Sequence, residues 1–229
     1  MKKPLTIITC LLLYMVVTSF VIDTRLKTQK VIIKSNTIAD YFNVVIAVRE
    51  YCDLMSKYGY QGVAPKTVIS FNTDPLGKFE HPGQLAYTLC VSKNIYLRSY
   101  RNLCGLNGEF YGTPNLFRYY DFSRSIMVHE LVHVFMMGNG VKETAIQEFI
   151  AYSIGMESLQ RPLKSKILAS AKRLRIIPYG LDQAVSEIVL AFGDYYSLKV
   201  YLFWNGLSTE KRKEVINGIV SGKIRSIVY

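Results

Sequence analysis

The sequence lacks several features that would assign a protein to a class at first sight. It has no internal repeats and no low-complexity stretches, which argues against solenoid and disordered architectures. Its 4 cysteines include no Cys-x-x-Cys pair, so a cysteine-bound zinc module is not expected. Only 3 histidines are present, and none follows His133. A metal site built on histidine would therefore need a different kind of ligand from the later part of the chain.

The N-terminal segment has the pattern of a targeting sequence. Lys2 and Lys3 are followed by an apolar run from residue 5 to residue 22. Val17-Thr18-Ser19 supplies small-residue cleavage context, so residues 1–22 are predicted to be a signal peptide. The run is also just long enough to span a bilayer, and the alternative is an N-terminal membrane anchor. In both cases residues 23–229 are predicted to form one exported domain, periplasmic or secreted, possibly anchored by residues 5–22.

One motif has the spacing that metal chemistry needs. His129-Glu130-Leu131-Val132-His133 is a His-Glu-x-x-His sequence. Histidines four apart on a helix point to the same side, so both imidazoles can hold one metal ion. Glu130 is rotated away from them and can reach a metal-bound water without ligating the metal. Zinc (Zn²⁺) suits imidazole and lowers the pKa of its water to about 7, so the motif predicts a hydrolytic zinc site.

The surrounding residues predict a buried helix over 121–137. Asp121 or Ser123 can cap its start, and Gly138-Asn139-Gly140 offers a left-handed stop. The residues between are apolar on nearly every side, which is typical of a buried helix, and the segment is too short to span a bilayer. Burying polar groups without partners costs several kcal/mol. The alternative to a metal is therefore a pair of core histidines satisfied by hydrogen bonds.

A third ligand is expected from the next predicted helix, Val141–Leu159, because catalytic zinc usually has three protein ligands and a water. If the short turn folds the two helices side by side, the midpoint of the histidines lies about 10 Å before the turn. Glu148 lies about 12 Å beyond it, at nearly the same level. Glu143 lies about 4 Å beyond the turn and Glu157 about 25 Å beyond it, so neither is level with the histidines. Glu148 is therefore the predicted ligand.

The His-Glu-x-x-His motif followed by Glu148-Phe-Ile-Ala151 resembles the gluzincin group of zinc metallopeptidases, the broad class that includes thermolysin. The resemblance covers roughly residues 121–155. It implies that Glu130 is the general base and that the small Ala151 lets the two helices pack closely. The zinc ligands that it implies are His129, His133 and Glu148.

The sequence departs from thermolysin in two respects. The interval between His133 and Glu148 is shorter, and Tyr152 stands where thermolysin-like enzymes have an aspartate that orients a ligand histidine. No residue is therefore assigned to orient the ligand histidine. A phenol near the developing oxyanion would assist catalysis, and Tyr152 shares a helix face with Glu148, so Tyr152 is a candidate catalytic residue. Tyr195 and Tyr196 are further candidates.

Hydrophobic periodicity and turn residues predict an α+β fold. A helix is expected over Asn36–Tyr58, and a loop over Arg101–Tyr120. The expected strands are Pro65–Phe71, Leu85–Val91 and Asn94–Ser99, the last two possibly forming a hairpin. The expected later helices are Pro162–Ile176, Leu181–Phe192 and Ser208–Ser221, whereas Tyr195–Trp204 suits helix or strand. By resemblance this order is zincin-like: a small sheet with an N-terminal helix, a buried active-site helix and a helical C-terminal half. The resemblance also implies that a peptide is laid along the strand before the site.

Three cysteines remain after Cys10 of the targeting segment, and an exported chain permits disulfides. Cys90 and Cys104 enclose a short loop whose closure would contribute about 3 kcal/mol. That pairing would leave Cys52 odd, and Cys52 could instead pair with either, so the connectivity stays open. His81 is expected to be an ordinary loop histidine.

Basic residues exceed acidic ones by 28 to 17, which gives a net charge of +11. Several of them gather around one predicted helix: Arg161, Lys164, Lys166, Lys172, Arg173 and Arg175. Such a run is usually a solvated face, and the functional alternative is affinity for an anionic membrane or cell-wall surface. Nucleic acid is not expected as a partner of an exported chain.

Two functions follow from these observations. The first is an exported zinc-dependent peptidase that hydrolyses peptide bonds of a peptide or protein substrate through a zinc-bound water activated by Glu130. The second is a non-catalytic exported envelope or binding protein on a zincin scaffold. Glu130 favours the first, because a structural zinc site has no use for a buried carboxylate beside its ligands.

Overall fold

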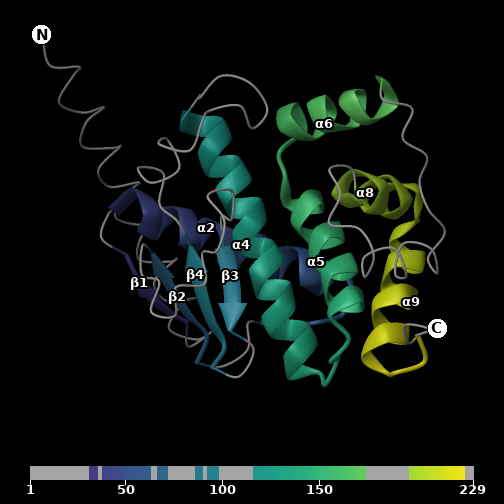
Figure 1. The fold of residues 1–229 in the computed structure, drawn as a ribbon, viewed down its shortest axis with the longest axis horizontal. Helices are drawn as coiled ribbons and strands as arrows, with labels where there is room; N and C mark the ends of the chain where they lie inside the picture. The colour runs from purple at the N-terminus through teal and green to yellow at the C-terminus, as the bar shows by residue number, and fades with distance from the viewer. Residues whose placement is uncertain are drawn as a thin grey trace, which may run out of the picture.

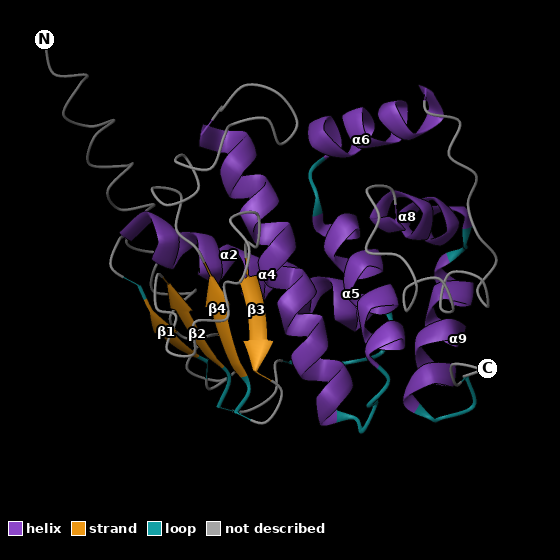
Figure 2. Ribbon diagram, in the orientation of Figure 1, coloured by secondary structure: helices purple, strands orange, loops and turns teal. Residues whose placement is uncertain are grey.

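The computed structural model describes residues 31–35, 38–62, 66–71, 86–89, 92–97, 116–173 and 196–224. A small sheet lies at one side, and the longer helices pack beside it (Figures 1 and 2). The prediction of an α+β fold is confirmed. The described elements are β1 (Ile32–Lys34), α2 (Ile38–Lys57), β2 (Val68–Phe71), β3 (Ala86–Leu89), β4 (Asn94–Leu97), α4 (Leu116–Gly138), α5 (Thr144–Ser158), α6 (Arg161–Arg173), α8 (Tyr196–Gly206) and α9 (Thr209–Val220).

The four described strands form one sheet in the order β1-β2-β4-β3. β1 and β2 are parallel, as are β2 and β4, whereas β3 runs antiparallel to β4. The predicted hairpin is therefore confirmed, and its turn places Lys93 at a φ of 55°. β3 stands at one edge of the described sheet, on the side that packs against α4.

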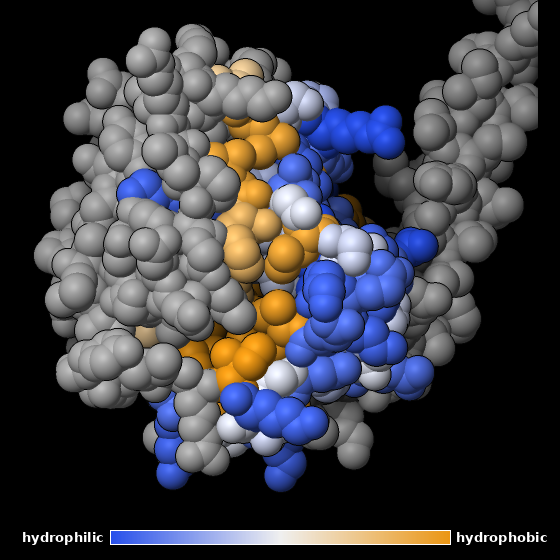
Figure 3. Space-filling view, turned by 90° about the vertical axis from the view of Figure 1, so that its right-hand side faces the viewer, coloured by the Kyte–Doolittle hydropathy of each residue, from blue (hydrophilic) through white to orange (hydrophobic). Residues whose placement is uncertain are grey.

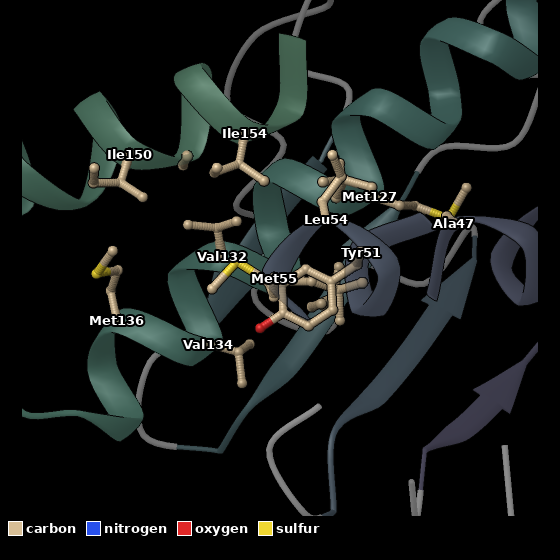
Figure 4. Close-up of a cluster of buried hydrophobic side chains, with 14 of the residues drawn as sticks. Ala47, Tyr51, Leu54, Met55, Met127, Val132, Val134, Met136, Ile150 and Ile154 are labelled. Atoms are coloured by element: carbon tan, nitrogen blue, oxygen red, sulfur yellow. The ribbon is translucent and has the colours of Figure 1, made fainter. Parts of the chain in front are cut away.

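The hydrophobic core lies where α2, α4 and α5 meet (Figure 4). Each of these helices contributes apolar side chains that are almost completely buried. These side chains recur every three to four residues, so they lie on one side of their helix. Those labelled in the close-up include Tyr51 and Met55 from α2, Met127 and Val132 from α4, and Ile150 and Ile154 from α5. The predicted burial of the histidine-bearing helix is confirmed.

Helix α4 begins earlier than expected. It starts at Leu116, so the predicted loop over Arg101–Tyr120 is wrong for its last five residues. The prediction that Asp121 or Ser123 caps the helix is wrong for the same reason, since both lie inside it. The Asp121 carboxylate instead accepts from the backbone N–H of Gln160 at 3.3 Å and pairs with Arg124. The end is as expected: α4 stops at Gly138, and Gly140 takes the left-handed φ of 80°.

Most of the remaining described helices agree with the segments predicted from the sequence. α5 and α6 match the predicted segments to within a few residues, and Tyr196–Gly206 is a helix rather than a strand. At the start of α9 the Ser208 hydroxyl accepts from the backbone N–H of Lys211. β1 was not predicted, because three residues are too short to show an alternating pattern. None of the described helices combines the length and apolar character that crossing a membrane requires.

Some predictions concern residues outside the described ranges. They are the targeting segment of residues 1–22, the helix over Leu181–Phe192, and the side chains of His81, Cys90, Cys104, Arg175 and Tyr195. Cys52 lies in α2, half-buried against the core.

The face that carries α6, α8 and α9 is shown in Figure 3, where hydrophobic residues form a band between hydrophilic residues and residues that are not described. Two basic residues of α6 differ in environment. Arg161 is exposed, whereas the Lys164 ammonium donates to the backbone carbonyl of Glu157 at 2.8 Å. Lys164 therefore makes a hydrogen bond within its own domain.

A partly buried polar cluster joins the C-terminal end of α5 to three other parts of the chain. The Glu157 carboxylate accepts from the Tyr58 hydroxyl at 2.6 Å and from the Trp204 indole N–H at 2.9 Å. It also pairs with the Arg212 guanidinium at 3.3 Å. Burial and the hydrogen bond to Glu157 raise the pKa of Tyr58 far above its ordinary value, so this phenol stays protonated and keeps donating. Glu157 therefore binds the ends of α2 and α5 to α8 and α9.

Candidate metal centre

Helix α4 places His129 and His133 one turn apart with their rings on the same side. Their ring centroids are 4.8 Å apart, and their Nε2 atoms approach to 3.0 Å. This is the arrangement that four-residue spacing dictates on a helix. Both imidazoles thus direct the same nitrogen toward one point.

Helix α5 brings Glu148 to that point. One carboxylate oxygen lies 3.4 Å from His129 Nε2 and the other lies 3.4 Å from His133 Nε2. Glu143 is exposed at the N-cap of α5, and Glu157 belongs to the partly buried polar cluster described above. Of the three glutamates offered by the sequence, the structure therefore brings Glu148 to the histidines.

The donor atoms are spaced as metal ligands are. Two atoms held about 2.0–2.1 Å from a tetrahedral zinc ion lie roughly 3.3–3.4 Å apart. The separations of 3.0, 3.4 and 3.4 Å among His129, His133 and Glu148 match that spacing to within a few tenths of an ångström. Among the described residues, these three form the group of histidine, cysteine or acidic side chains that could hold a metal ion.

Glu130 lies beside this group but is held by a different partner. Its side chain is buried, and one carboxylate oxygen accepts a hydrogen bond from the Thr88 hydroxyl of β3. The strand at the edge of the sheet thus orients the acid that stands next to the candidate metal ligands.

The electrostatics of the three donors are strongly coupled. Burial works to raise the pKa of Glu148, but the hydrogen bonds and charges of His129 and His133 hold it well below its ordinary value. Burial likewise works to lower the pKa of His133, yet Glu148, Glu130 and Gln147 together raise it above 6.5. In the metal-free protein Glu148 is therefore ionised and His133 readily keeps a proton, which a metal ion would have to displace.

Tyr152 lies on the same face of α5 as Glu148. Its ring meets the His129 ring edge-on, with centroids 4.6 Å apart. Burial, together with the nearby charges of Glu148 and Glu130, raises the pKa of Tyr152 to about 12. The phenol is therefore protonated at neutral pH and can donate a hydrogen bond. Tyr196 opens α8, so it is not part of the segment that carries the candidate ligands.

Sequence reasoning missed two residues that shape the centre. Gln147 hydrogen-bonds to His133 Nδ1 at 3.3 Å, and its signal was a second polar residue beside Glu148 in a largely apolar helix. Gly155 is a point of close approach between α4 and α5. The Ser125 hydroxyl donates to the Gly155 carbonyl at 2.6 Å, alongside the backbone of His129. The buried Ala151, which the resemblance singled out, lies one turn before this contact.

Gly155→Ala is expected to destabilise the domain and to weaken metal binding. A Cβ at this position would lie 3.1 Å from both the His129 Cβ and the Ser125 carbonyl oxygen, so the two helices would have to separate. Overpacking of this kind typically costs about 1–3 kcal/mol. The measurement is urea unfolding together with metal titration. The control is Gly138→Ala, where a Cβ meets nothing within 4 Å. Equal stability of the two variants would contradict the close approach.

Fold and site together define an α+β domain that carries two histidines and one glutamate able to hold a metal ion. The chain belongs to a family of unknown function (DUF6639), whose sequence pattern matches residues 80–228. The matched residues include β3, α4 and α5, and hence every side chain of the candidate centre. No curated protein and no solved structure matches the chain.

Proposed function

We propose that this protein is an exported zinc-dependent peptidase with a zincin-like fold. The observation that carries the proposal is the convergence of two imidazole Nε2 atoms and one carboxylate, spaced 3.0–3.4 Å apart, beside a second carboxylate that is held separately. Nitrogen and oxygen donors of this kind are those of catalytic zinc sites, which keep one position open. The pattern of residues 1–22 supports export.

Each protein group has a distinct task in this function. His129, His133 and Glu148 would hold the metal, and zinc would supply Lewis acidity toward a peptide carbonyl and an acidified water. Glu130 accepts the proton of the attacking water and returns it to the leaving amine. The hydrogen bond from the Thr88 hydroxyl orients the Glu130 carboxylate.

Tyr152 is the candidate for stabilising the oxyanion. Its phenol stays protonated because its pKa is raised to about 12, and its ring lies against His129. A hydrogen-bond donor aimed at developing negative charge accelerates acyl transfer. Tyr152 lies on α5 one turn from Glu148, with its ring against a candidate metal ligand.

The edge strand β3 supports a peptide as substrate. β3 pairs with β4 on one side and is the edge strand of the described sheet, and an edge strand is the kind of element to which an extended chain can add. Thr88 belongs to the same strand and touches Glu130. A peptide paired with β3 would therefore lie next to the general base.

Metal analysis of two matched variants tests the proposal. The protein purified without chelator is expected to contain one zinc ion, and Glu148→Gln is expected to lose it because a negative ligand is removed. Glu143→Gln makes the same chemical change at the exposed N-cap of the same helix and should keep the metal. Absence of zinc from the unmodified protein would overturn the proposal. Bound zinc without hydrolysis of a mixed peptide library would favour a non-catalytic envelope protein.

A further inference from the structure

Gln147 connects the candidate metal centre to the turn that joins its two helices. Its side chain is buried, with 7% of its surface exposed, and it makes two hydrogen bonds in opposite directions. The amide Nε2 donates to the Val141 carbonyl at 2.8 Å, and the amide Oε1 lies 3.3 Å from His133 Nδ1. Val141 in turn donates its backbone N–H to the Met136 carbonyl at 3.0 Å.

The Val141 carbonyl determines which group donates and which accepts in each of these hydrogen bonds. A carbonyl oxygen only accepts, so the Val141 carbonyl requires the NH₂ end of the Gln147 amide. The other end of the amide is then an oxygen, which also only accepts. His133 Nδ1 must therefore carry the hydrogen. In a neutral imidazole with a hydrogen on Nδ1, the lone pair lies on Nε2, the nitrogen that faces His129 and Glu148.

We propose that Gln147 is a positioning residue that fixes the tautomer and ring orientation of His133 so that Nε2 is ready to bind the metal. The proposal rests on the metal site of the proposed function. Gln147 thus gives His133 an orienting partner, whereas Tyr152 packs against the other histidine, His129. The partner comes from the residue immediately before Glu148, and it is a neutral amide.

A glutamine is the residue type that this position demands. The side chain must donate to Val141 and accept from His133 at the same time, which a carboxylate cannot do and an aliphatic residue cannot do at all. A neutral partner also adds no charge to a centre that already contains Glu130 and Glu148. Loss of the group that hydrogen-bonds to a metal-ligating histidine typically lowers metal affinity by about 10–100-fold.

Two variants and a spectroscopic readout test the assignment. Gln147→Leu removes both hydrogen bonds, whereas Gln147→Glu keeps an acceptor for His133 and loses only the donor to Val141. Zinc affinity is measured by competition with a chromophoric chelator, and the His133 tautomer is read from the nitrogen chemical shifts of its ring. Gln147→Leu is expected to weaken zinc binding by about 10–100-fold and to mix the tautomers. Gln147→Glu should keep the Nδ1–H tautomer and bind zinc more tightly than Gln147→Leu. Gln160→Leu, at an exposed glutamine, should match the unmodified protein.

The outcomes separate this inference from the proposed function. If the unmodified protein shows His133 with its hydrogen on Nε2 at a pH where the ring is neutral, the assignment is wrong, whether or not zinc binds. If Gln147→Leu binds zinc as tightly as the unmodified protein and keeps its tautomer, the assignment is also wrong. If the unmodified protein binds no zinc but His133 holds its hydrogen on Nδ1, the metal function fails while the positioning role of Gln147 stands. A loss of thermal stability alone, with the tautomer unchanged, would reduce Gln147 to a structural residue.

Discussion

Glu130→Gln is expected to abolish peptide hydrolysis while leaving zinc bound. The glutamine is nearly the same size, and its amide oxygen can still accept the hydrogen bond from Thr88, so the local structure should persist. It cannot accept a proton at neutral pH. Removing a general base typically lowers the rate by roughly 10²–10⁴-fold. The measurement combines zinc content with single-turnover hydrolysis of a mixed peptide library.

The controls for Glu130→Gln show whether Glu130 acts as a general base or as a metal ligand. Loss of zinc from Glu130→Gln would show that Glu130 binds metal, although it is not one of the three residues whose donor atoms converge. Undiminished hydrolysis would show that another group takes the proton. Thr88→Val is a second, milder variant, because it removes the hydroxyl that orients Glu130 but keeps the carboxylate. It should reduce the rate without changing zinc content.

Glu157→Leu, outside the centre, is expected to cause a large loss of stability. It leaves the Arg212 guanidinium, the Tyr58 hydroxyl and the Trp204 indole N–H without their shared acceptor. Breaking a buried ion pair by removing one partner typically costs about 3–5 kcal/mol, which is an upper bound here because the Arg212 and Glu157 side chains keep 16% and 15% of their surface exposed. For a domain of this size, that corresponds to a fall in the melting temperature of roughly 6–20 °C.

Glu214→Leu is the matched control for this prediction. Glu214 also pairs with a basic side chain, Lys211, but both are about two-thirds exposed, with side-chain exposures of 64% and 65%. Exposed pairs contribute little, so its melting temperature should not change measurably. Thermal unfolding followed by circular dichroism provides the comparison. Equal melting temperatures of the two variants would show that the Glu157 cluster does not hold the four helices together.

The candidate metal centre could be predicted from the sequence because its ligands lie close together in the chain, on two successive helices. A four-residue spacing and the rise of a helix sufficed to place Glu148 level with His129 and His133 on the next helix. The start of α4 was placed too late, because loop signals at Gly112 and Pro114 were extended over the residues that follow. Helix ends depend on such signals more than helix interiors do.

The supporting contacts were not predictable in the same way. Thr88 and Glu130 are 42 residues apart, and Tyr58 and Glu157 are 99 apart, so no periodicity links them. Gly155 is one of 15 glycines, and its close contact with His129 emerges only when the two helices are packed. Gln147 had a local signal, but its hydrogen-bonding partners depend on the shape of the turn at Val141.

The placement of the three candidate ligands on two successive helices has a consequence for how the site is assembled. Bringing them together requires closure of only the turn between α4 and α5, and the entropy cost of closing a loop rises with its length. The contact between Thr88 and Glu130 is of much longer range, since it requires β3 to dock onto α4. We therefore expect metal capture to be a property of the helical hairpin, and catalytic competence to be a property of the completed domain. If β3 separated from α4, Glu130 would lose its hydrogen bond from Thr88, and hydrolysis would fall while the three ligands still hold the metal.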